Sequence, residues 1–282
     1  MPIIRVKGLS YRYPGSSRTV LKNITLNIDE GEYVVITGPS GCGKTTLCRC
    51  FNGLIPHFYG GNLEGEIIVN GFPVKETSTS TLAQYVGMVF QEPESQLFLL
   101  SVEREVAFGL ENLGLPREEI VKRVDEALKL VGISHLRDRA PHELSGGEQQ
   151  KVALAACIAM QPKILVLDEP TANLDPISAV NILNLLQSLR NKLGVTIILV
   201  EHRLEAVASV ADRFIVMNDG MIVSDGDPRD VLSSTNIEGL GVGVPKVIQL
   251  YKDLKRRNVI FNLVPLTPKE VKACLMEVLE FD

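Results

Sequence analysis

The chain has 282 residues, of which 45% are hydrophobic and 22% are charged, and its formal net charge is −5. This composition is typical of a globular protein with a sizeable core and excludes a disordered chain. The acidic balance lacks the basic surplus that binds nucleic acid, so we expect no nucleic-acid partner. Five cysteines without paired spacing argue against a disulfide framework and indicate a reducing cytosol. No apolar run has the roughly 18–20 residues of a membrane span, so we expect a soluble chain that reaches a membrane only through a partner.

The first 37 residues are expected to form strands. Turns are predicted at Pro14-Gly15 and at Asp29-Glu30-Gly31, and the apolar run Tyr33–Thr37 predicts a buried strand. A G-x-x-x-x-G-K-[ST] motif follows at once and leads into a helix, which is the context of a phosphate-binding loop. The loop consists of Gly38, Pro39, Ser40, Gly41, Cys42, Gly43, Lys44 and Thr45, and Thr46 follows it.

The next part of the chain changes from strands to helices. A strand pair is predicted around residues 65–70 and 85–90, and a helical pattern then runs from about residue 95 to residue 144. Pro116 suits the first position of a helix. One apolar helix face is formed by Ile120, Val124, Ala127, Leu128 and Val131.

From Ser145 onwards, helices and strands alternate. A helix follows Ser145, Ile164–Leu167 predicts a strand, Asp175-Pro176 opens another helix, and residues 195–200 predict a further strand. Alternating strands and helices predict a parallel core sheet.

Residues 244–282 predict two amphipathic helices. The first carries an apolar stripe of Val247, Leu250, Tyr251 and Leu254. Thr267-Pro268-Lys269-Glu270 is a capping box that opens the second helix. Its apolar face contains Val271, Cys274, Leu275, Val278 and Leu279. The pattern leaves two interpretations open: the helices pack on the rest of the chain, or they form a small interaction domain.

The phosphate-binding loop supplies the first candidate site. Backbone N–H groups across residues 41–46 and the amino terminus of the following helix can surround the β- and γ-phosphates of a nucleotide. Lys44 adds a positive charge, and the Thr45 hydroxyl is a candidate Mg²⁺ ligand.

Two adjacent carboxylates end the strand at Ile164–Leu167. Asp168 is a candidate to complete the Mg²⁺ site, directly or through water. Glu169, as the next residue, points elsewhere and is the candidate to orient and deprotonate an attacking water molecule. The alternative is a helix N-cap followed by an acidic first turn.

A third motif, Leu144-Ser145-Gly146-Gly147-Glu148-Gln149, lies between the loop and the carboxylates. With all three motifs in this order and spacing, residues 3 to about 232 resemble the ATPase domains of ABC (ATP-binding cassette) proteins. The resemblance implies ATP and Mg²⁺ as cofactors and an α/β fold of the P-loop NTPase class, with a RecA-like parallel core sheet. It also implies an antiparallel β subdomain, a helical signature subdomain at about 95–150 and a small carboxyl-terminal helical extension. We expect an ABC ATPase domain over residues 1–236, with residues 237–282 as the extension and a candidate dimerisation domain.

The same resemblance assigns roles to three further residues. Gln91 matches the Q-loop glutamine, which contacts Mg²⁺ and the water and senses the partner protein. His202 matches the switch histidine that contacts the γ-phosphate, so Glu169, His202 and Gln91 form the expected catalytic set. Asp175 matches the D-loop and, before Pro176, is also a good helix N-cap.

Two other features follow from the family. Tyr13 matches the aromatic residue that stacks on adenine, with Tyr11 as the rival. In the family two cassettes pack head to tail, so Ser145, Gly146 and Gly147 bind the partner's ATP, together with Asp175. We therefore expect a second ABC ATPase, either an identical chain or a sister ATPase.

Within the family, the chain is most similar to ATPase subunits of energy-coupling-factor (ECF) importers. This similarity rests on residues 87–98, residues 102–112 and the turn Asp225-Gly226-Asp227-Pro228. It implies location on the cytoplasmic face of the membrane, a transmembrane scaffold that docks near Gln91–Glu105, and a separate membrane subunit that binds the solute. Glu201-His202-Arg203 departs from the usual Thr-His-Asp. Conventional ABC importers and small exporters are the alternatives, because they share the core motifs.

Overall fold

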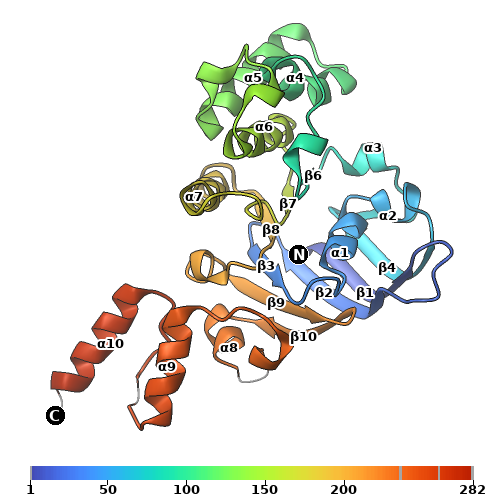
Figure 1. Ribbon diagram of the computed structural model, residues 1–282. Coiled ribbons are helices and arrows are strands. Elements are labelled where there is room, and N and C mark those ends of the chain that lie inside the picture. Colours follow the sequence, from blue (N-terminus) through green and yellow to red (C-terminus); the bar gives the residue numbers. More distant parts are fainter. Residues whose placement is uncertain (1, 235–236, 260, 281–282) are drawn as a thin grey trace.

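A six-stranded sheet forms the centre of the computed structural model, which describes residues 2–234, 237–259 and 261–280 (Figure 1). The strand order is β10-β9-β3-β8-β7-β6. The parallel strands are β3 (Tyr33–Thr37), β6 (Val86–Val89), β7 (Ile164–Asp168), β8 (Thr196–Val200) and β9 (Arg213–Asn218). At one edge, β10 (Met221–Gly226) runs antiparallel to β9. The predicted parallel core sheet is confirmed.

A four-stranded antiparallel sheet, in the order β2-β1-β4-β5, forms the predicted β subdomain. Its strands are β1 (Pro2–Arg12), β2 (Leu21–Asp29), β4 (Asn62–Val69) and β5 (Phe72–Pro73). The predicted pairing of residues 65–70 with 85–90 is wrong, because β4 pairs with β1 and β5, and β6 pairs with β7. Every residue of β6 is buried, as in a strand covered on both faces, whereas much of β4 is exposed.

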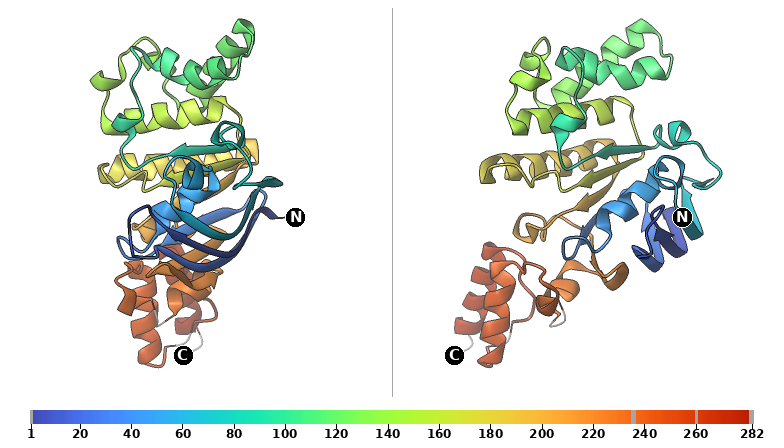
Figure 2. Two further views of the ribbon diagram at one scale, coloured as in Figure 1. Left: turned by 90° about the vertical axis from the view of Figure 1, so that its right-hand side faces the viewer. Right: turned by 45° about the vertical axis from the view of Figure 1, so that its right-hand side comes forward.

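The helices group into layers around the central sheet (Figures 1 and 2). The helix α1 (Lys44–Phe51) leads out of the phosphate-binding loop, α2 (Leu54–His57) follows it, and α3 (Thr79–Leu82) contacts the turn between them at Gly53. The helical subdomain contains α4 (Val102–Asn112), α5 (Arg117–Val131) and α6 (Gly146–Ala159). Pro116 lies one position earlier than predicted, since it is the N-cap of α5. Between the subdomain and the sheet lies α7 (Pro176–Leu193).

Side chains that alternate along the core strands enter two different hydrophobic clusters. Tyr33 and Val35 of β3 face a cluster shared with α4, α5, α6 and α7. Val34 and Ile36 face the other cluster, which contains α1 and the antiparallel sheet. Because both faces of the sheet are covered, the ends of its parallel strands are held rigidly.

The carboxyl-terminal segment continues the larger of these clusters. It contains α8 (Pro228–Ser233), α9 (Lys246–Arg256) and α10 (Pro268–Glu280). Val247, Ile248 and Leu266 are buried in the main cluster. Arg229 of α8 binds both carboxylate oxygens of Glu270 at 2.9 and 3.0 Å. The packing interpretation is therefore correct for this inner surface of the extension.

The capping box at the start of α10 is half formed. The Thr267 hydroxyl accepts a hydrogen bond from the Glu270 N–H at 3.2 Å, but the Glu270 carboxylate binds the Leu266 N–H and Arg229. The predicted boundary at residue 236 falls on the undescribed residues 235–236, and the side chains of Val278 and Leu279 also lie outside the described part. In the described part of the chain, no helix combines the length and apolarity needed to cross a membrane.

Candidate functional site

The phosphate-binding loop connects the buried end of β3 to the start of α1. The Lys44 side chain is buried, and its Nζ donates hydrogen bonds to the carbonyls of Gly38 at 2.9 Å and Pro39 at 3.0 Å. Gly38 has a φ of 145°, and a Cβ at this position would lie 2.0 Å from the Met217 carbonyl oxygen. Only glycine fits this contact, which places the loop against the end of β9.

Cys42 is a small, buried side chain within this loop. Its side chain is 4% exposed, and its Sγ lies 4.0 Å from the Lys44 ammonium. Burial raises the pKa of the Cys42 thiol despite this neighbouring cation. A buried, neutral thiol is poorly reactive, so no redox or nucleophilic role is indicated.

Asp168 and Thr45 form the pair predicted to hold Mg²⁺. Burial raises the pKa of Asp168, and a hydrogen bond with the Thr45 side chain partly opposes that shift. Within the described residues, the buried Oδ1 of Asp168 has no hydrogen-bond partner. A buried carboxylate oxygen without a donor suits a hard cation, so these residues fit Mg²⁺.

Glu169 and His202 lie within hydrogen-bonding distance of each other. They follow the ends of the neighbouring parallel strands β7 and β8, where Asp168 is in register with Val200. The Glu169 N–H donates to the Val200 carbonyl at 3.0 Å, and Glu169 adopts a left-handed φ of 51°. His202 Nε2 is 2.9 Å from Glu169 Oε1. A carboxylate and an imidazole are thus paired at the carboxyl edge of the sheet, where α/β folds place their ligands.

Glu201 is a residue of the site whose role the sequence pattern did not predict. Its carboxylate is 3% exposed and accepts three hydrogen bonds. The donors are the backbone N–H groups of His202 at 2.8 Å and Arg203 at 2.9 Å, and the Thr171 hydroxyl at 2.5 Å. A glutamate directly after a buried strand was the available signal, but its long-range partner, Thr171, comes from the chain reversal after β7.

Gln91 follows β6 at the edge of the sheet and is exposed. It lines a cavity of about 310 Å³ between the segment after β6, the start of α6 and the loop before α7. The other lining residues include Glu94, Gly146, Asn173 and Leu174. Among the described residues, no hydrogen bond joins Gln91 to Thr45 or Asp168. The single chain therefore places Gln91 beside the signature motif and the D-loop.

The signature motif caps the start of α6. The Ser145 hydroxyl and its backbone N–H both donate to Glu148 Oε2, at 2.7 and 2.9 Å. The pKa of Glu148 is lowered, mainly by the hydrogen bond from the Ser145 side chain. Gly147 packs closely on Ser178 of α7, where a Cβ would lie 3.3 Å away. Ser145 and Gly146 are exposed.

Asp175 acts as the N-cap of α7, as predicted from the sequence. Its Oδ1 accepts hydrogen bonds from the N–H groups of Ile177 and Ser178, both at 3.0 Å. These bonds satisfy two donors of the first helical turn, and a hydrogen bond from the Ser178 side chain, followed by the one from the Ser178 N–H, lowers the pKa of Asp175. One carboxylate oxygen holds the cap, so the interpretation as a helix cap is compatible with the predicted D-loop role.

The two candidate tyrosines differ in exposure. Tyr11 is 1% exposed, and its hydroxyl donates to the Gly60 carbonyl at 2.9 Å, so its ring belongs to the core. Tyr13 is partly exposed, and its hydroxyl lies 3.2 Å from the Thr46 hydroxyl. Tyr13 therefore presents the ring beside the phosphate-binding loop, which favours it over Tyr11 as the adenine contact.

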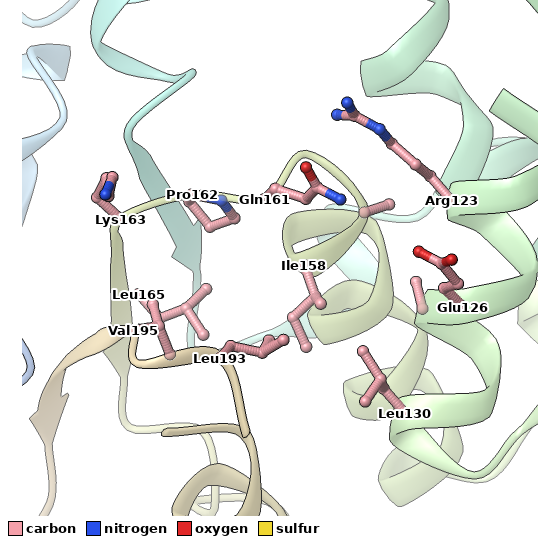
Figure 3. Close-up of a pocket in the computed structure, with 12 residues that line it drawn as sticks. Arg123, Glu126, Leu130, Ile158, Gln161, Pro162, Lys163, Leu165, Leu193 and Val195 are labelled. Atoms are coloured by element: carbon pink, nitrogen blue, oxygen red, sulfur yellow. The ribbon is translucent and has the colours of Figure 1, made fainter. Parts of the chain in front are cut away.

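A different cavity of about 310 Å³ lies between α5, the end of α6 and the starts of β7 and β8 (Figure 3). Arg123 and Glu126 line one side, and Lys163, Leu165 and Val195 line the other. Lys163 and Leu165 mark the beginning of β7, whereas Asp168 is its end. This cavity therefore belongs to the junction of the helical subdomain and the core, away from the predicted nucleotide site.

A phosphate-binding loop between β3 and α1, faced by a buried carboxylate at the end of β7, defines the class of P-loop NTPases. The family model described as "ABC transporter" matches residues 21–172. The chain is 44% identical over 272 residues to a protein of Pyrococcus horikoshii that carries the provisional name ABC transporter ATP-binding protein, covering 96% of this chain and 95% of that one. A relative of Methanosarcina mazei with the same provisional name is 45% identical over 250 residues, covering 88% of this chain but only 42% of its own length.

Two solved structures are similar. One is cbiO1 from Clostridium perfringens, described as part of the ABC transporter complex cbiONQ, with a TM-score of 0.76 and 37% identity; the match covers 89% of this chain and 99% of that one. The other is a dimeric ATP-binding cassette in a post-hydrolysis state bound to ADP and Pi, with a TM-score of 0.69 and 30% identity over 80% and 98% of the chains. The chain belongs to the ABC transporter family, as an ABC-type ATPase that uses ATP with Mg²⁺.

Proposed function

We propose that the chain is the ATP-hydrolysing subunit of an importer of the ECF type and acts at the cytoplasmic face of the membrane. Two observations support this proposal: the similarity of residues 87–98 and 102–112 to such subunits, and the likeness to cbiO1 over nearly all of that chain. A separate membrane subunit would bind the solute.

The paired Glu169 and His202 carry the proposed chemistry. Glu169 accepts a proton from the attacking water, and His202 holds the Glu169 carboxylate and contacts the γ-phosphate. Lys44 and the loop amides at 41–46 bind the phosphates, since they offer positive charge and N–H donors. Thr45, Asp168 and Gln91 would hold Mg²⁺, which supplies charge neutralisation on the phosphate oxygens. Tyr13 stacks on adenine.

A second cassette completes each site in this proposal. Ser145, Gly146 and Gly147 start α6, where a helix amino terminus favours an anion. In the single chain Gly146 lines the cavity beside Gln91 and the D-loop, and Ser145 and Gly146 are exposed, so the motif is available to the nucleotide of a partner chain. Asp175 would lie at the same contact. Two chains arranged head to tail, identical or sisters, would share two sites.

The docking site for the membrane scaffold is an apolar groove between the core and the helical subdomain. Leu54 and Ala83 line it on the core side, and Phe98, Phe108 and Met160 line it on the helical side. Phe98 is 65% exposed and lies edge to face with Phe108 at 5.2 Å between ring centres. An exposed aromatic pair in an apolar groove fits one face of an amphipathic helix.

In the sequence, the apolar run Leu97–Leu100 is flanked by Glu92, Glu94, Glu103 and Glu105, which predicts a rim of four carboxylates around this groove. Only two of these carboxylates are free to form such a rim. Glu105 is 5% exposed, and its Oε2 accepts a hydrogen bond from the Leu99 N–H at 2.6 Å. Glu105 therefore fixes the segment before α4 and is not available to a partner. Glu103 binds Arg137 at 2.5 Å. Glu92 and Glu94 are exposed and are left to attract a basic residue of the docking helix.

A detergent pull-down with the membrane scaffold tests this assignment. The double change Phe98→Ala with Glu94→Lys should weaken complex formation while basal ATPase of the soluble chain stays near normal. Met221→Ala is a matched control, because Met221 is an exposed apolar residue on the distant edge strand β10. Full complex formation and transport by the double variant would refute the docking site.

The extension at residues 237–282, taken as a unit beside the ATPase domain at 1–236, is proposed to hold two chains together between turnovers. Its inner face is packed on the ATPase domain, but Leu250 and Met276 are 44% and 52% exposed. Such residues on an amphipathic helix pair offer apolar area to a second copy.

A further inference from the structure

The carboxylate of Glu201 joins the two chain segments that bear the proposed catalytic pair. One segment is the reversal after β7, which carries Glu169 and continues through Thr171 to Leu174. The other is the turn after β8, which carries His202. Glu201 Oε1 accepts the N–H groups of His202 and Arg203, and its Oε2 accepts the Thr171 hydroxyl. Both segments therefore meet at one buried side chain.

The same two segments are linked a second time. The Arg203 guanidinium donates to the Leu174 carbonyl at 3.4 Å, directly before the D-loop Asp175. Within the reversal, the Ala172 N–H donates to the Glu169 carbonyl at 3.1 Å and the Leu174 N–H to the Thr171 carbonyl at 3.2 Å. These bonds hold the reversal together by itself, so Thr171 is a fixed point against which Glu201 can hold the turn at His202.

The burial of Glu201 shows that this arrangement needs its hydrogen bonds. Both Glu201 and Thr171 are almost fully buried, at 3% and 0% exposure. A buried carboxylate is costly unless donors satisfy it, and here three donors do so. Removal of the carboxylate would leave the buried Thr171 hydroxyl unpaired and would release the partly buried N–H groups of His202 and Arg203, so the turn at His202 would rearrange.

We propose that Glu201 is a positioning residue for hydrolysis, whose carboxylate fixes the turn at His202 against Thr171 and so sets the distance between His202 and Glu169. Glu201 acts through hydrogen bonds and does not touch the nucleotide. This inference rests on the proposed catalytic role of His202. It gives a function to the glutamate that stands where importer cassettes usually have threonine.

Steady-state ATPase kinetics of three variants test the inference. Glu201→Ala should lower kcat by about tenfold or more, the scale for misplacing a catalytic group, with KM for MgATP changed less than about twofold. Glu201→Gln should recover most of the rate, because its amide oxygen still accepts both N–H groups and its amide nitrogen can donate to Thr171. Glu205→Ala is the control, since Glu205 is an exposed carboxylate on the same segment.

A double-mutant cycle separates positioning from general stability. In a His202→Ala background, Glu201→Ala should have little further effect on kcat, because the group that it positions is gone. Equal losses in both backgrounds, or a Glu201→Gln variant as slow as Glu201→Ala, would overturn the positioning role. A His202→Ala variant with wild-type kcat would instead refute the proposed role of His202.

Thermal unfolding of each variant accompanies the kinetics. If Glu201→Ala does not fold, Thr171→Val decides the question, because valine replaces the buried hydroxyl with a methyl group of similar size. Thr171→Val should lower kcat in the wild-type background and have no added effect in the His202→Ala background. A wild-type kcat for a folded Thr171→Val would overturn the inferred link.

Discussion

The carboxyl edge of the central sheet and the face formed by α6 and the segment after β6 differ in how completely one chain assembles them. At the sheet edge, Glu169 and His202 are within 2.9 Å of each other, and Lys44 is buried among loop carbonyls. On the other face, Gln91, Ser145 and Phe98 are exposed. The first region is built by strands buried on both sides. The second is built on helices and a loop whose outer surfaces are exposed in the part of the chain that the structure describes.

This difference in assembly separates the residues that a single chain can position for chemistry from those that need a partner. The residues proposed to bind and activate the nucleotide are held by the core sheet, whose packing resists displacement. The residues proposed to contact the second cassette and the membrane partner lie on the exposed face of α6 and the segment after β6, where a docking event can move them. Changes at the sheet edge should therefore affect chemistry, and changes at the outer face should affect assembly.

The largest expected effect is at the sheet edge. Glu169→Gln should bind MgATP but hydrolyse it at least about a hundredfold more slowly, because the glutamine cannot accept a proton. It should also accumulate as an ATP-bound dimer by size-exclusion chromatography with light scattering. Wild-type turnover in this variant would exclude Glu169 as the base and would contradict the assignment of the hydrolysis step to the sheet edge.

Much of this sheet edge could be predicted from the sequence. The run of apolar residues before Gly38, Asp168 and His202 predicted three strand ends, and parallel strands bring such ends to one edge. The contact between Glu201 and Thr171 could not be predicted, because Thr171 is 30 residues away along the chain and follows the left-handed turn at Glu169.

Prediction was weaker on the outer face. Four carboxylates near the groove were expected to form a rim. In the structure, Glu105 is buried and accepts a hydrogen bond from the Leu99 N–H, and Glu103 forms a salt bridge with Arg137. Sequence gives the charges of these residues, whereas their exposure depends on how the helical subdomain folds back on itself. The mistaken pairing of residues 65–70 with 85–90 has the same origin, since adjacency in sequence does not decide which sheet a strand joins.

A moderate effect is expected on the outer surface of the extension. Leu250→Asp with Met276→Asp should shift the nucleotide-free protein from dimer to monomer in light scattering, because the charges would interrupt apolar contact between copies. ATPase activity at high protein concentration should be largely retained. An unchanged dimer mass would show that α9 and α10 serve only to pack on their own ATPase domain.

The smallest effect concerns the stability of the sheet edge without ligands. Burial raises the pKa of Asp168, so at neutral pH the charged carboxylate opposes folding, and this penalty decreases as the pH falls through the folded-state pKa. Asp168→Asn should therefore raise the thermal midpoint of the nucleotide-free protein at pH 7 by a few degrees, and the gain should shrink toward acidic pH. An Asp168→Asn midpoint below wild type at pH 7 would contradict this balance.

The central claim is that two chains complete each other's sites, and a mixing experiment tests it most directly. Ser145→Arg blocks the signature motif of one chain, and Lys44→Ala removes the phosphate contact of the other, so each variant alone should be inactive although it remains folded. In a 1:1 mixture, random pairing gives one intact site in half of the dimers, so a self-pairing chain should recover up to about a quarter of the wild-type ATPase rate. No recovery, although the mixed dimer is shown to form, would contradict the shared-site account.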